Sequence, residues 1–115
     1  MKACIVGKSP MDFTAGDTGE VIEGVKLYYF APKDEVEGYF AGEMWVQKKS
    51  KLYHKVMGLE TEKPFMGNIE YDVQPGKKRP LSVLMDIRPL DGEEVIQLAD
   101  NPYWQNFLVF HPAIN

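Results

Sequence analysis

The chain contains few of the side chains on which disulfide frameworks, metal sites and general-base catalysis depend. Cys4 is the single cysteine, so an internal disulfide framework is excluded, which fits a reducing compartment. His54 and His111 are the only histidines, and neither stands at a metal-ligand spacing from Cys4 or from the other. No serine lies in a nucleophile-elbow pattern, and no glycine motif opens a phosphate-binding helix. We therefore predict a protein that is not an enzyme and uses no metal ion or cofactor.

Long apolar runs are also lacking. No stretch approaches the roughly 20 residues that cross a bilayer, and the apolar start at 1–6 is too short for the core of a signal peptide. We expect a cytoplasmic protein that does not contact a membrane. With 44% hydrophobic and 26% charged residues in a length of 115, the chain can fill one folded core.

Basic side chains are missing from the end of the chain. All 13 lysines and arginines lie in residues 1–90, together with 13 of the 17 acids, so this region is neutral. The remaining four acids account for the net charge of −4: Asp91, Glu93, Glu94 and Asp100. This change in charge predicts a domain over 1–90 and a separate C-terminal segment over 91–115.

Residues 1–90 show the alternation of apolar and polar positions, broken by Gly and Pro, that is typical of β-strands. In 20–30, for example, Val25, Leu27 and Tyr29 share one face. Closing such strands on themselves removes exposed sheet edges. The sequence therefore predicts an all-β fold, a five-stranded OB-type barrel, with a small open sandwich as the alternative. The predicted strands are 2–7 (resuming at 12–14), 20–30, 36–46, 68–73 and 80–89.

The same alternation predicts which residues of the later strands share a face. Gly42 marks a predicted bulge or bend at a barrel corner. In 36–46, Phe40, Met44 and Val46 are expected on one face and Tyr39, Glu43 and Trp45 on the opposite face. In 68–73, Ile69, Tyr71 and Val73 are expected on one face and Glu70 and Asp72 on the other. In 80–89, the two faces are Leu81, Val83, Met85 and Ile87 on one side and Ser82, Asp86 and Arg88 on the other.

The segments outside these strands are shorter. Residues 50–59 fit either a helical turn or a loop. Residues 91–98 predict a short helix with acids in its first turn, stopped before Pro102. The unusually apolar residues 103–110 either pack their rings on the barrel or recruit a partner.

Two basic loops without acids indicate an anionic partner. Residues 47–55 hold four lysines, and 74–80 hold three further basic side chains. Single-stranded nucleic acid is bound by lysines and arginines along its phosphates and by aromatic rings under its bases. The alternative is that the loops only promote solubility and the rings pack within the sheet. The predicted nucleic-acid-binding residues are Lys26, Tyr28, Phe30, Tyr39, Trp45, Lys48, Lys49, Lys51, Tyr53, Lys77, Lys78 and Arg79.

Five short motifs occur in order along residues 1–90. They are Met1-Lys2-Ala3-Cys4-Ile5 with Phe13-Thr14, Gly24-x-x-x-Tyr28, Pro64 to Val73, Gly76 to Leu81, and Met85 to Leu90. In this order and at this spacing they resemble the single-stranded DNA-binding (helix-destabilising) proteins of filamentous phages, the gene V protein family. The resemblance stops before the C-terminal segment.

The resemblance implies an OB-type barrel, a symmetric homodimer, and cooperative, largely sequence-independent coating of single-stranded DNA in the replication of a phage or other mobile element. Tyr28 matches a stacking tyrosine, and the hairpin with Lys77, Lys78 and Arg79 matches the loop that covers DNA or a neighbouring dimer. The loop at 15–20 departs from the family, because it carries acids where the phage proteins carry arginines.

Two choices stay open at this stage. The nucleic acid could be DNA or RNA. The acidic C-terminal segment is absent from the small phage proteins and resembles, in kind, the acidic C-termini by which bacterial single-strand binding proteins recruit partners. The alternative function is therefore a protein-interaction module on the same small barrel, docking a partner through residues 91–115.

Overall fold

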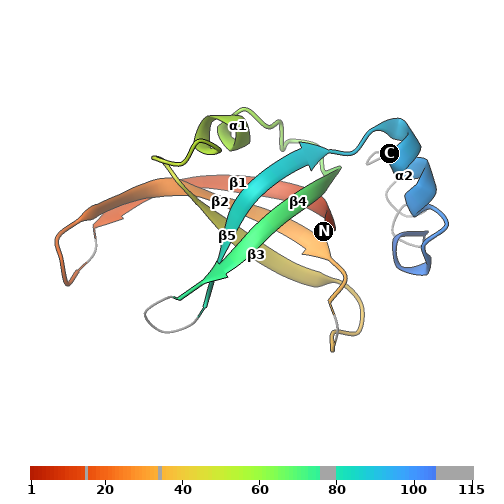
Figure 1. Cartoon of the computed structure of the whole chain (residues 1–115), viewed down its shortest axis with the longest axis horizontal. Coiled ribbons are helices and arrows are strands. Elements are labelled where there is room, and N and C mark those ends of the chain that lie inside the picture. The colour runs from red at the N-terminus through yellow and green to blue at the C-terminus, as the bar shows by residue number, and fades with distance from the viewer. Residues whose placement is uncertain (15, 34, 76–79, 106–115) are drawn as a thin grey trace.

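The computed structural model contains five strands that close into a barrel in the order β1-β2-β3-β5-β4 (Figure 1). It describes residues 1–14, 16–33, 35–75 and 80–105. The predicted all-β, OB-type barrel is confirmed. Within those residues, no helix is both long enough and apolar enough to span a bilayer. The elements are β1 (Lys2–Thr14), β2 (Val21–Ala31), β3 (Phe40–Gln47), α1 (Tyr53–Met57), β4 (Phe65–Gln74), β5 (Leu81–Pro89) and α2 (Gly92–Leu98).

Strand β1 runs without interruption through Ser9 and Pro10, where the sequence indicated a break. It pairs with β4 only over Lys2–Ile5, so its later residues have a free edge. Proline is tolerated on such an edge, because its missing N–H removes no ladder hydrogen bond. Since β2 pairs with β3 only from Gly24 onward, the end of β1 (residues 12–14) and the start of β2 (residues 21–23) form a two-stranded ribbon that extends beyond the barrel (Figure 1).

Strand β3 begins at Phe40, four residues later than the alternation indicated. The backbone before it is left-handed at Glu35 (φ 71°) and Gly38 (φ 88°), which a strand does not allow. Gly42 does not form the predicted bulge, because β2 and β3 pair in regular register past it. Its missing Cβ instead leaves room for the ring of Tyr29, whose Cζ would lie 2.6 Å from such an atom.

The β4–β5 hairpin contains a bulge that the alternation did not predict. Glu70 pairs with Asp86, but Tyr71 pairs with Leu84, which leaves Met85 without a partner. The extra residue reverses the faces of β5, so that Leu84 is buried and Met85 is exposed. The predicted apolar face of β5 is therefore wrong for the residues before Ile87, and Leu81 and Met85 are exposed. Strand β4 has no extra residue, so Ile69, Tyr71 and Val73 share one face as predicted, but Tyr71 and Val73 are exposed.

The barrel interior is filled by the residues that the alternation placed inward on β2 and β3. Short helix α1 resolves the ambiguous segment 50–59 and packs on this core through Val56, which is fully buried. The Lys8 ammonium donates to the carbonyls of Met57 and Leu59, at 2.5 Å each, where the last turn lacks backbone partners. The core residues are Ala3, Ile5, Val25, Leu27, Tyr29, Ala31, Met44, Val46, Val56, Ile69, Leu84 and Ile87.

A second apolar cluster joins the C-terminal segment to the barrel. It consists of Cys4, Met66, Leu98 and Trp104, and the ring of Trp104 is only 2% exposed. Tyr103 packs against it. Tyr103 and Trp104 thus pack on the barrel, which is one of the two alternatives predicted for residues 103–110. Residues 106–110 lie outside the described part of the chain.

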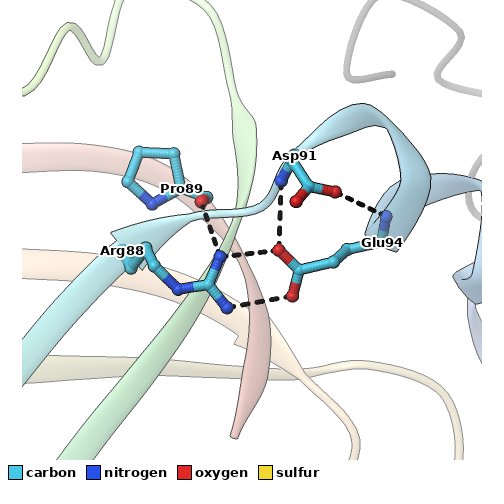
Figure 2. Close-up of polar contacts among 4 residues, drawn as sticks. All are labelled: Arg88, Pro89, Asp91 and Glu94. Carbon is cyan, nitrogen blue, oxygen red and sulfur yellow. Dashed lines mark hydrogen bonds and ion pairs between the residues drawn. The ribbon is translucent and has the colours of Figure 1, made fainter.

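The predicted helix at 91–98 is confirmed as α2 and is fixed at its start by charged side chains. Asp91 accepts from the Glu94 backbone N–H at 2.8 Å, and the Glu94 carboxylate accepts from the Asp91 N–H, which forms a capping box. Glu94 also accepts two hydrogen bonds from Arg88, at 2.6 and 2.9 Å (Figure 2). This bidentate pair ties α2 to the end of β5.

Candidate nucleic-acid interface

The outward face of β2 presents three of the predicted binding residues in alternation. Lys26, Tyr28 and Phe30 are each half-buried, and they pair across the sheet with Trp45, Glu43 and Ala41, respectively. In OB-type barrels, the β2–β3 face together with the β1–β2 and β4–β5 loops is the surface that binds oligonucleotides. The barrel thus places these side chains on the face where such a ligand is expected.

A groove of about 670 Å3 lies on this side of the barrel, and we call it the aromatic groove. Tyr28, Phe30 and Phe40 line it, and the root of the β4–β5 hairpin contributes Pro80. Lys33 also lines it, with its ammonium 4.3 Å from the centroid of the Phe40 ring. The groove therefore combines rings with one exposed cation and one carboxylate, that of Glu43, which pairs with Lys26. Residues Lys77, Lys78 and Arg79 directly precede Pro80 in the sequence and lie outside the described residues.

The sequence did not identify Lys33 and Phe40 as site residues. Alternation placed Phe40 on the inward face, although the residue is at the start of β3 and only half-buried. The pairing of Ala31 with Phe40 across the β2–β3 connection brings Lys33 next to this ring. Only the register between β2 and β3 links Lys33 to Phe40, and this register cannot be read from either strand alone.

Trp45 does not provide the open ring that the sequence predicted. Its side chain faces outward, but it is only 8% exposed. The ring lies against Gly24, which has no side chain to displace it, and its centroid is 6.4 Å from that of Phe13. Trp45 therefore packs the β1–β2 ribbon onto the barrel.

Two other predicted rings are engaged by the protein itself. The Tyr39 ring lies 4.6 Å from that of Tyr103, edge to face, and its hydroxyl donates to the Tyr103 carbonyl at 3.4 Å. Tyr53, on α1, is half-buried against the barrel core. Tyr39 keeps 41% of its surface exposed, whereas Tyr53 mainly holds α1 in place.

The predicted lysines that the structure describes do not form one basic track. The Lys26 ammonium lies 3.3 Å from the Glu43 carboxylate, and that of Lys48 lies 3.0 Å from Glu23. The hydrogen bond to Glu23 raises the pKa of Lys48. Lys48 and Lys49 line a different hollow, of about 720 Å3, together with Glu20 and Glu23.

Lys49 and Lys51 are exposed on the turn that links β3 to α1, and neither has an ion pair among the described residues. The described structure thus separates these lysines from the aromatic groove. Of the predicted set, only Tyr28 and Phe30 line that groove.

The described residues offer little for covalent chemistry. Burial raises the pKa of the Cys4 thiol to about 11, so that it stays protonated at neutral pH. No group of three or more His, Cys, Asp or Glu side chains in the described ranges is placed to hold a metal ion. Comparisons with protein-family models, with curated proteins and with solved structures gave no significant match to this chain.

Proposed function

We propose that the chain is a non-catalytic, largely sequence-independent single-stranded DNA-binding protein, and that the aromatic groove is its principal binding site. The observation that supports this proposal is the clustering of Tyr28, Phe30 and Phe40 beside Lys33 on the β2–β3 side of an OB-type barrel. Bases stack on such rings while cations contact the phosphates, and neither contact depends on the base.

The hairpin that borders this groove is the second element of the proposal. Pro80 lines the groove, and the three basic residues just before it in the sequence would supply phosphate contacts. Lys26 would contribute only after leaving Glu43, which is a small cost because exposed ion pairs add little stability. We further propose, from the resemblance to phage proteins, that this activity serves the replication of a phage or other mobile element, and, from the single cysteine, that it takes place in the cytoplasm.

Variants of the aromatic groove test this assignment by fluorescence anisotropy with labelled oligo-dT. Tyr28→Ala should weaken binding by about tenfold, since stacking contributes roughly 1–3 kcal/mol per base. Lys33→Gln should weaken it several-fold, whereas Lys63→Gln, which removes a lysine outside this groove, should not.

Unchanged affinity of a folded Tyr28→Ala variant would remove the aromatic groove from the proposal. The same titration with oligo-rU separates DNA from RNA as the ligand. Circular dichroism spectra of each variant show whether a loss of affinity reflects a loss of fold.

We also propose that the protein is a homodimer that associates through the β4–β5 hairpin. Outside the aromatic groove, this hairpin exposes apolar side chains on both strands: Tyr71 (46%), Val73 (54%) and Met85 (53%). Exposed apolar side chains gathered on one projecting element are typical of a protein interface. A second copy fits this site, because the resemblance implies a symmetric dimer.

Analytical ultracentrifugation of Val73→Asp tests the dimer. The substitution should shift the protein toward the monomer, because it places a charge among apolar side chains that a second copy would bury. Ile96→Asp, at a 72% exposed position on α2, is the matched control and should leave the mass unchanged. A wild-type protein that sediments as a monomer would contradict the proposal.

A further inference from the structure

A second groove, of about 540 Å3, lies between α2 and the connection from α1 to β4, and we call it the α2 groove. Its floor is formed where β4 begins and β5 ends, by Phe65, Met66 and Leu90. The Leu90 backbone N–H donates to the Met66 carbonyl at 2.9 Å, which holds the two strand ends together. Leu59 on one wall and Val95 of α2 on the other complete an apolar surface.

The walls of the α2 groove are held in place from both sides. Leu59 and Phe65 pack on the barrel core, whereas Leu90 and Val95 pack on the second apolar cluster. The Arg88–Glu94 pair and the capping box fix the start of α2 (Figure 2). The groove is therefore preformed, so a ligand would not have to order it on binding.

The rim of the α2 groove is acidic. Glu60 and Glu62 line it, and Asp91 and Glu93 flank Gly92, which also lines it. All four carboxylates belong to exposed residues, and none forms an ion pair within the described part of the chain. Lys63 is the only basic side chain among the described residues that line it, and the charge of nearby Arg88 is offset by Glu94. The α2 groove therefore has an apolar floor surrounded by a negatively charged rim.

We propose that the α2 groove binds a short segment of a partner protein in which an apolar side chain is flanked by lysines or arginines. The apolar side chain would fill the floor, and the basic residues would pair with the rim carboxylates, which steer the segment and select against acidic ones. The same carboxylates repel phosphates, so this site is independent of the aromatic groove. The barrel would then carry two separate binding sites.

Fluorescence anisotropy with a labelled synthetic peptide, in which a Leu-Phe pair lies between lysine pairs, tests the proposal on the full chain. Gly92→Trp is the blocking variant, because a Cβ at Gly92 meets no atom within 4 Å and the ring can cover the groove without disturbing the core. It should weaken peptide binding by about tenfold or more, whereas Gly92→Ala, the matched control, should not.

Charge variants test the acidic rim separately. The double substitution Glu60→Lys with Glu62→Lys should weaken binding of the same peptide by about tenfold, whereas Glu20→Lys, in the connection between β1 and β2, should not. A peptide with glutamates in place of its lysines should not bind. Oligo-dT binding should be unaffected by Gly92→Trp, so failure of this proposal is distinguishable from failure of the DNA-binding proposal.

Three results would overturn the inference. The first is that the folded wild-type protein does not bind the lysine peptide. The second is equal binding of that peptide by the Gly92→Trp and Gly92→Ala variants. The third is a reduction of the sedimenting mass by Gly92→Trp, which would show that a second copy of the chain occupies the groove instead.

Discussion

The contact between Gly24 and Trp45 shows how one absent side chain determines whether a ring is available to a ligand. A Cβ built on Gly24 would lie 2.3 Å from the Val46 carbonyl oxygen and 2.5 Å from the Trp45 ring. The glycine therefore lets the indole lie against the backbone of β2. Alternation along one strand predicts that Trp45 points outward, but burial of the ring depends on a residue of the neighbouring strand.

Gly24→Ala should destabilise the protein by about 1–3 kcal/mol, because the added methyl group overlaps a backbone oxygen that cannot move aside as a side chain could. Urea unfolding measures this change in the free energy of unfolding. Gly92→Ala is the matched control, since a methyl group there meets no atom within 4 Å. Equal stability of the two variants would show that the backbone of β3 does not approach Gly24 this closely in solution.

Among the larger elements, α2 depends on a charged contact that is sensitive to acid. The hydrogen bonds from Arg88 lower the pKa of Glu94 from 4.5 to about 2, with a further contribution from the Asp91 backbone N–H. A carboxyl group whose pKa is lower in the folded state stabilises that state above its unfolded pKa. This stabilisation is lost as the pH falls from about 4.5 toward 2.

Acid should therefore loosen α2 in a way that depends on Glu94. The NMR signal of the Trp104 indole N–H, in the cluster that α2 completes, should shift as the pH falls through this range. In Glu94→Gln the shift should be largely absent, because the ionisable group is gone. Glu93→Gln, which removes an acid without an ion pair in the described structure, should titrate like the wild type. A pH response shared by all three proteins would contradict this role for Glu94.

How much of each element could be predicted depends on whether its signal is local. The acids and the stop at Pro102 predict α2 correctly, because helix caps are read from adjacent residues. The alternation in β2 predicts Val25, Leu27 and Tyr29 in the core for the same reason. The bulge at Met85 could not be predicted, since it depends on the register between two strands and reverses the faces of the β5 residues that precede it.

At the scale of the whole molecule, the closed barrel brings together residues that no sequence pattern connects. Lys33 and Phe40 join Tyr28 and Phe30 in one groove because β2 and β3 pair across a short connection. Lys48 and Lys49, which the sequence grouped with these rings, line another hollow beside Glu20 and Glu23. The sequence thus predicts that the candidate site combines aromatic rings with lysines, but it does not predict which rings and lysines lie together.

The proposed function depends on the binding of single-stranded DNA by the aromatic groove and the adjoining hairpin. Both tryptophans are buried, so the label belongs on the DNA, and the measurement is the anisotropy of labelled oligo-dT titrated at increasing salt. The account predicts binding at low salt that weakens with a log–log slope of about −0.7 for each phosphate contacted. Folded protein that leaves the anisotropy unchanged at low salt would contradict it.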